Sequence, residues 1–184
     1  MAFTYKYGLQ DLHWYVIKDS STLAVGEWCK SYDNAGYVAR GTKEVAGTGF
    51  VCAIGKGQGQ LPPVKGDHTA GSTNTSDTTT VTTAADNTTT RLYWALVDES
   101  ILSVYSAQVN GTLGSTNGSP TVTGQRGGGI SVDSDGSNWG KVLETTHTRT
   151  LGDIDNFSVI GVDPDDTSRL LVKNAMPEWM SDQS

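Results

Sequence analysis

The sequence predicts an all-β protein: a single-domain antiparallel β-sandwich or barrel-like fold over residues 1–184, with long Thr/Gly-rich loops and extended terminal arms. Three observations lead to this fold class. Charged residues make up only 18% of the chain, so polarity is carried by Thr, Ser, Asn and 22 Gly, which favours strands and turns. Short runs of β-branched and aromatic residues alternate with Gly, Asn, Asp and Pro. No segment keeps a helical apolar face over three turns.

The first third of the chain contains four predicted strand runs. Residues 1–13 are rich in aromatic side chains and form either a short tail before the first strand, at residues 14–18, or an arm that grips a neighbouring subunit. Residues 27–32 and 37–40 are predicted to form a hairpin, because the Asp-Asn-Ala-Gly sequence between them suits the positive φ angles of a tight turn. Residues 49–54 are predicted to form a buried strand that ends in a glycine-rich turn.

Residues 62–90 differ in character from the strands around them. Two prolines open this segment, threonine dominates it, and Val81 is its only large aliphatic side chain between residues 66 and 87. Such a stretch buries too little apolar surface to offset the entropy of ordering it. We therefore interpret it as an exposed loop or excursion, although β-branched threonine could add an edge strand against a partner surface.

The second half contains the strongest strand patterns. Residues 91–97 and 101–109 are separated by Asp-Glu-Ser and are expected to form a central hairpin. A loop-rich region follows, in which residues 141–144 could open another strand. Residues 157–162 and 169–173 flank an Asp/Pro-rich turn. In the C-terminal tail, residues 174–184, only one helical turn is expected.

The charge balance argues against nucleic acid and anionic membranes as partners. Thirteen Lys and Arg against 20 Asp and Glu give a net charge of -7, and no basic cluster offsets it locally. The N-terminus lacks the apolar region of a secretion signal, and no apolar run approaches the ~18 residues that span a bilayer. Cys29 and Cys52 are expected to be free core thiols, with a disulfide between neighbouring strands as the alternative.

We found no sequence motif for catalysis, for a metal or for a cofactor, and we expect no enzyme. The three histidines stand far apart in the sequence, and the two cysteines do not form a C-x-x-C pair. Residues 133–144 place Asp and Asn oxygens at the spacing of a calcium loop, but Asn138 stands where an EF-hand requires Gly. Asp163, Asp165 and Asp166 are assigned to a turn rather than to an acid–base pair.

Tryptophan suits both core packing and binding surfaces. Trp28 and Trp94 fall inside predicted strands and are expected to belong to the core. Trp139 lies in a Gly/Ser/Asn-rich loop and Trp179 lies near the C-terminus. These two are therefore candidates for intermolecular contacts, with simple packing as the alternative.

Several segments resemble the head decoration, or cement, proteins of tailed bacteriophages, which are small β-rich proteins on the outside of the capsid. The resemblance lies in residues 25–30, 36–40, 49–55 and 159–164. The threonine-rich stretch and the loops near Gly127 have no counterpart in that family. The resemblance implies a virion protein that is made in the host cytoplasm and binds the outer capsid surface.

The same resemblance implies the mode of action. Copies of the protein, commonly homotrimers, would clamp neighbouring subunits of the major capsid protein, and affinity would come from multivalency and from arms or added strands. The candidate intersubunit contacts are Phe3, Tyr5, Tyr7, Trp139, Met176 and Trp179. No nucleic acid, membrane or cofactor is implied.

Two other functions stay open from the sequence. The protein could be a phage fibre, spike or tail component that binds host-surface glycans through Trp139. It could also be a small polysaccharide hydrolase that uses acids such as Asp133 and Glu144.

Overall fold

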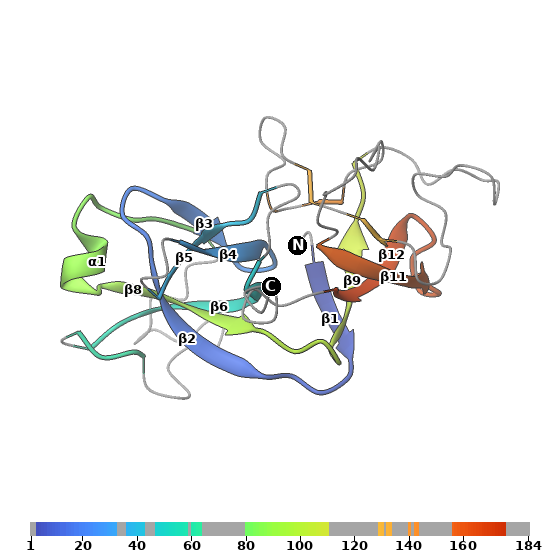
Figure 1. Ribbon diagram of the computed structural model, residues 1–184, viewed down its shortest axis with the longest axis horizontal. Coiled ribbons are helices and arrows are strands. Elements are labelled where there is room, and N and C mark those ends of the chain that lie inside the picture. Colours follow the sequence, from blue (N-terminus) through green and yellow to red (C-terminus); the bar gives the residue numbers. More distant parts are fainter. Residues whose placement is uncertain are drawn as a thin grey trace, which may run out of the picture.

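The described residues form mainly strands, which are arranged as a closed barrel and a second sheet beside it (Figure 1). These arrangements come from a computed structural model, and they confirm the predicted all-β class. The structure describes residues 3–32, 36–42, 47–58, 60–63, 80–110, 129–130, 132–133, 140, 142–143 and 156–175.

The barrel has five strands in the order β2-β5-β4-β6-β8. Their bounds are Leu12–Ile17 for β2, Trp28–Tyr32 for β4, Tyr37–Arg40 for β5, Gly49–Lys56 for β6 and Tyr93–Asp98 for β8. The barrel closes because β2 pairs with β8 on one side and with β5 on the other. The β2–β5 pair is parallel, whereas the other barrel pairs are antiparallel.

Small elements accompany the barrel. Strands β3 (Thr22–Ala24) and β7 (Thr80–Thr82) form a two-stranded sheet, and their Leu23 and Val81 side chains join the apolar core of the barrel. The one-turn helix α1 (Asn87–Thr90) follows β7. The alternative that threonine adds an edge strand therefore holds at β7, and α1 is a short helix that the sequence pattern did not predict.

The second sheet also has five strands, in the order β1-β9-β12-β11-β10, and all its pairs are antiparallel. Their bounds are Phe3–Tyr7 for β1, Val104–Gln108 for β9, Gly129–Ile130 for β10, Phe157–Val162 for β11 and Arg169–Asn174 for β12. We call it the outer sheet. Strand β1 lies at one of its edges.

An aromatic layer joins the barrel to the outer sheet. Phe50 of the barrel stacks on Tyr105 of the outer sheet with 3.9 Å between ring centroids, and Phe3 lies 5.2 Å from Phe50. Along β6, Phe50 and Cys52 face this shared core, while Val51 faces the barrel interior. The period-two alternation of a strand thus lets β6 contribute to both cores.

Several predictions are confirmed. Strands β4 and β5 pair as the predicted hairpin, β11 and β12 pair around the Asp/Pro-rich turn, and β6 is almost wholly buried. Trp28 and Trp94 are buried, at 0% and 7% exposure. Both cysteines are free.

The predicted central hairpin is wrong. Strand β8 pairs with β2 and β6 in the barrel, whereas β9 pairs with β1 and β12 in the outer sheet. The reason is that the two strands serve different cores: Ala95 and Val97 face the barrel interior, and Tyr105 and Ala107 face the aromatic layer. The residues between them form a crossover instead of a turn.

Part of the predicted arm region is a strand. Residues 3–7 form β1, and Phe3 is 1% exposed in the shared core, so the first strand begins earlier than the sequence pattern indicated. Residues 64–79, within the threonine-rich segment, and residues 176–184 lie outside the described residues.

Candidate interaction surface between the barrel and the outer sheet

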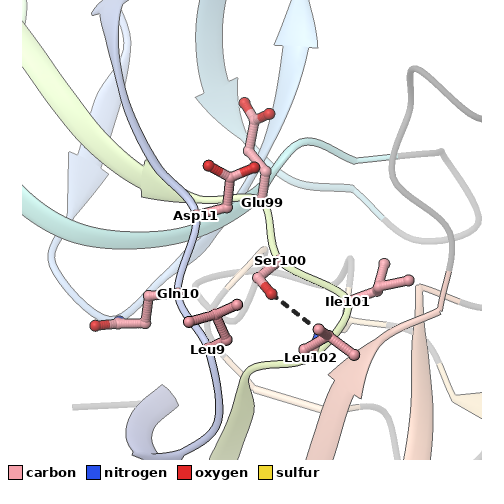
Figure 2. A pocket seen from close by; sticks show the side chains of 7 residues that line it. All are labelled: Leu9, Gln10, Asp11, Glu99, Ser100, Ile101 and Leu102. Atoms are coloured by element: carbon pink, nitrogen blue, oxygen red, sulfur yellow. Dashed lines mark hydrogen bonds between the residues drawn. The ribbon is translucent and has the colours of Figure 1, made fainter.

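Two chain segments cross from the outer sheet to the barrel side by side. Residues 8–11 connect β1 to β2, and residues 99–103 connect β8 to β9. The Glu99 amide donates a hydrogen bond to the Asp11 carbonyl at 2.9 Å, and the Ser103 hydroxyl donates to the Leu9 carbonyl at 2.9 Å. Figure 2 shows the two segments together. These bonds tie the two crossovers into one unit.

Gly8 allows the crossovers to approach this closely. Its φ of 113° lies in a region that side chains disfavour, and a Cβ added there would lie 2.1 Å from the Leu102 carbonyl oxygen. Only a residue without a side chain fits at this point of the first crossover.

A buried carboxylate fixes the crossovers to the barrel. Asp98, at the end of β8, is 0% exposed and accepts hydrogen bonds from the Asp11 amide at 3.0 Å and from the Ser100 amide at 3.1 Å. The Tyr105 hydroxyl donates to its other oxygen at 2.7 Å. A buried charge with three donors is well satisfied, so this cluster makes the surface above it rigid.

Cys52 and Gln10 complete the cluster without supplying a reactive group. The Cys52 sulfur lies 3.4 Å from the Tyr105 hydroxyl, to which the Gln10 amide donates at 3.3 Å. Burial raises the pKa of Cys52 to about 11 and raises that of Tyr105 as well. Cys52 therefore stays a thiol at neutral pH, and a thiol is a poor nucleophile.

The outer surface of the crossovers forms a shallow pocket of about 340 Å³. Its lining residues are Leu9, Gln10, Asp11, Glu99, Ser100, Ile101 and Leu102. Leu9, Leu102 and Ile101 are 69%, 59% and 40% exposed. In Figure 2, the carboxylates of Asp11 and Glu99 stand next to each other, apart from the aliphatic side chains.

Two exposed tyrosines of β1 precede the first crossover in the chain. Tyr5 is 39% exposed and its hydroxyl donates to the Gly8 carbonyl at 2.7 Å, while Tyr7 is 52% exposed and pairs with Val104 just after the second crossover. We call the five exposed side chains the junction strip: Tyr5, Tyr7, Leu9, Ile101 and Leu102. Three of them, Leu9, Ile101 and Leu102, line one pocket, and exposed apolar side chains that lie together are typical of protein-binding surfaces.

The residues predicted to make intersubunit contacts fall into three groups: exposed, buried and outside the described residues. Tyr5 and Tyr7 belong to the junction strip, Phe3 is buried in the shared core, and Trp139, Met176 and Trp179 lie outside the described residues. The sequence interpretation missed Leu9, Ile101 and Leu102. Their signal was a single leucine after Gly8, which was assigned to a tail, and the pair Ile101-Leu102 after Ser100, which was assigned to a strand.

The acidic residues considered for calcium binding or for hydrolysis are not brought together among the described residues. Asp133 is 3% exposed and accepts a hydrogen bond from Asn110, and Glu144 lies outside the described residues. In the described part of the chain, no three His, Cys, Asp or Glu side chains gather as a metal site would require.

No helix in the described part of the chain is long and apolar enough to cross a membrane.

Comparison of the chain with protein-family models, with curated proteins and with solved structures found no match.

Proposed function

We propose that the chain is a structural protein of a tailed-phage virion, which binds the outer capsid surface and stabilises contacts between major capsid protein subunits. The observation that carries a binding role is the junction strip, five exposed apolar side chains on crossovers held by the buried Asp98. The capsid as the partner rests on the sequence resemblance. The proposal includes a homotrimer and assigns no catalytic step to the protein.

Rigidity supports the binding role. A preorganised backbone loses little conformational freedom when a partner covers its surface, so more of the contact energy appears as affinity. Gly8, the crossover hydrogen bonds and Asp98 provide this preorganisation. A trimer would present three copies of the strip and so multiply a modest single-site affinity.

The test is co-sedimentation with capsid shells that lack decoration proteins, taken from the phage that encodes the chain. The variant Leu9→Ser/Leu102→Ser removes apolar surface from the strip. The control variant Leu61→Ser/Leu92→Ser changes two leucines of the barrel side that are 66% and 44% exposed. We expect the strip variant to bind at least about tenfold more weakly and the control variant to bind like the wild type.

Two results would overturn the proposal. One is wild-type protein that stays in the supernatant when capsids sediment at any protein concentration tested. The other is equal weakening by the strip variant and the control variant, since this would show that general surface polarity, and not the junction strip, governs attachment. Circular dichroism of both variants checks that they are folded.

A further inference from the structure

We infer that the pocket on the two crossovers, next to the junction strip, binds a lysine or arginine side chain. The partner protein presents this side chain on an exposed apolar segment. This inference rests on the proposed function, because it names the chemistry of the partner at the same surface. It follows from the charge, the shape and the rigidity of the pocket.

The charge of the pocket is negative at one end. Asp11 has a side chain that is 66% exposed, Glu99 lies beside it, and none of the seven lining residues is basic. The neighbours of these carboxylates are the His13 ring, 2.9 Å from Asp11, and the Tyr15 hydroxyl, which donates to Glu99. Tyr15 is neutral, so it orients Glu99 without cancelling its charge.

The shape suits a long cationic side chain rather than a small ion. Leu9, Ile101 and Leu102 offer aliphatic surface for the methylene groups of Lys or Arg, and the two carboxylates lie where the charged end would emerge. The planar guanidinium of Arg carries five N–H donors, which suits it to bind carboxylates. A bare metal ion would leave the apolar wall of the pocket without a role.

The pocket also keeps its form without a ligand. The Asp11 amide is bound by the Asp98 carboxylate, the Ser100 hydroxyl accepts a hydrogen bond from the Leu102 amide at 3.0 Å, and the crossovers are bonded to each other. A partner side chain therefore enters a site whose backbone is already ordered on folding. The exposed ion pair alone would contribute little to the affinity, so the aliphatic contacts are part of the recognition.

The experiment is an NMR titration of the full ¹⁵N-labelled chain with a synthetic peptide, acetyl-Ala-Leu-Arg-Leu-Ala-amide. The control peptide carries Glu in place of Arg. We expect saturable shifts of the amide signals of residues 9–11 and 99–102 with the Arg peptide, and no saturable shifts with the Glu peptide. Raising the salt concentration should weaken the Arg peptide's binding.

Matched variants locate the effect. Asp11→Asn and Glu99→Gln should each weaken Arg-peptide binding several-fold, because each removes one of the two facing charges. Asp86→Asn removes the same charge from an exposed position before α1, at the opposite end of the barrel in Figure 1, and should bind like the wild type. Equal shifts with both peptides, or unchanged binding by Asp11→Asn and Glu99→Gln, would overturn the inference.

A failure of the pocket inference can be distinguished from a failure of the capsid proposal. If the wild type sediments with capsids but the Arg peptide causes no saturable shift, the inference is wrong and the capsid proposal stands. If the Arg peptide binds at the pocket but the wild type does not sediment with capsids, the capsid proposal is wrong and the pocket assignment stands.

Discussion

Trp28 connects the barrel to the outer sheet. It is 0% exposed, its indole Nε1 donates to the Asn174 side chain at 3.3 Å, and its ring meets Phe157 edge-on at 5.4 Å. Gly41 and Gly47 lie against the ring, where any side chain would collide with it. Both positions thus require glycine because of a tryptophan that is not their neighbour in the sequence.

The packing around Trp28 predicts the effect of a single methyl group. A Cβ at Gly47 would lie 1.7 Å from the Trp28 ring, so Gly47→Ala should lower the free energy of unfolding by about 1–3 kcal/mol. Equilibrium urea unfolding measures this loss. At Gly161 a Cβ would meet nothing within 4 Å, so Gly161→Ala is the matched control and should change stability little. A Gly47→Ala protein as stable as this control would contradict the packing described.

At the scale of elements, an ion-pair cluster links β1 to the turn between β11 and β12. The Lys6 ammonium lies 3.1 Å from Asp163 Oδ2 and 2.9 Å from Asp165 Oδ2. Asp163 is 1% exposed, and its Oδ2 has this ion pair but no hydrogen bond of good geometry. Burial opposes its ionisation, yet hydrogen bonds from Ser106 and the Asp165 amide, together with Lys6, hold the Asp163 pKa below its ordinary value of 3.8.

This cluster predicts a loss of stability in acid. Because the folded-state pKa of Asp163 lies below the unfolded value, its contribution is complete above about pH 4 and disappears as the pH falls through the folded-state pKa. Urea unfolding between pH 6 and pH 2.5 should show a shallower decline for Asp163→Asn than for the wild type. Some decline remains, since hydrogen bonds from Ser168 also lower the pKa of Asp166.

The control for this prediction is Asp86→Asn, at the other end of the molecule from the turn (Figure 1). It should keep the wild-type dependence of stability on pH. An Asp163→Asn profile that runs parallel to the wild-type profile would show that the ion-pair cluster does not contribute to the acid sensitivity.

For the whole molecule, the important feature is that one strand serves two cores. Strand β6 places Val51 and Ile54 in the barrel interior and Phe50 in the aromatic layer. The Tyr105 hydroxyl of the outer sheet also donates a hydrogen bond to Asp98 of the barrel. The barrel and the outer sheet therefore support each other, and neither buries its apolar surface alone.

We accordingly predict that the described parts unfold as one cooperative unit. Native-state hydrogen exchange should give the same free energy for slow amides of the barrel, such as Ala95, and of the outer sheet, such as Leu170. Phe50→Ala should lower both values equally, by about 3–5 kcal/mol. As a control, Val162→Ala, at a side chain that is 44% exposed, should leave both nearly unchanged. Different losses in the two parts would show that they unfold independently.

The sequence by itself determined the features that depend on residues close together in the chain. Alternating side chains and turn residues predicted the β4–β5 and β11–β12 hairpins, and the unbroken apolar run predicted the buried strand β6. Composition predicted the all-β class. Of the candidate surface, the aromatic pattern near the N-terminus selected Tyr5 and Tyr7, but it could not distinguish them from Phe3, which is buried.

Tertiary structure alone decided which strands meet. Pairing of β2 with β8 and of β1 with β9 joins segments about 80 to 100 residues apart, and local pattern carries no information on such partners. The junction strip depends on these pairings, since Leu9 and Leu102 come together only where Gly8 permits close approach and Asp98 holds both crossovers. An aliphatic residue is a core residue or a contact residue according to what covers it, and covering is a property of the folded chain.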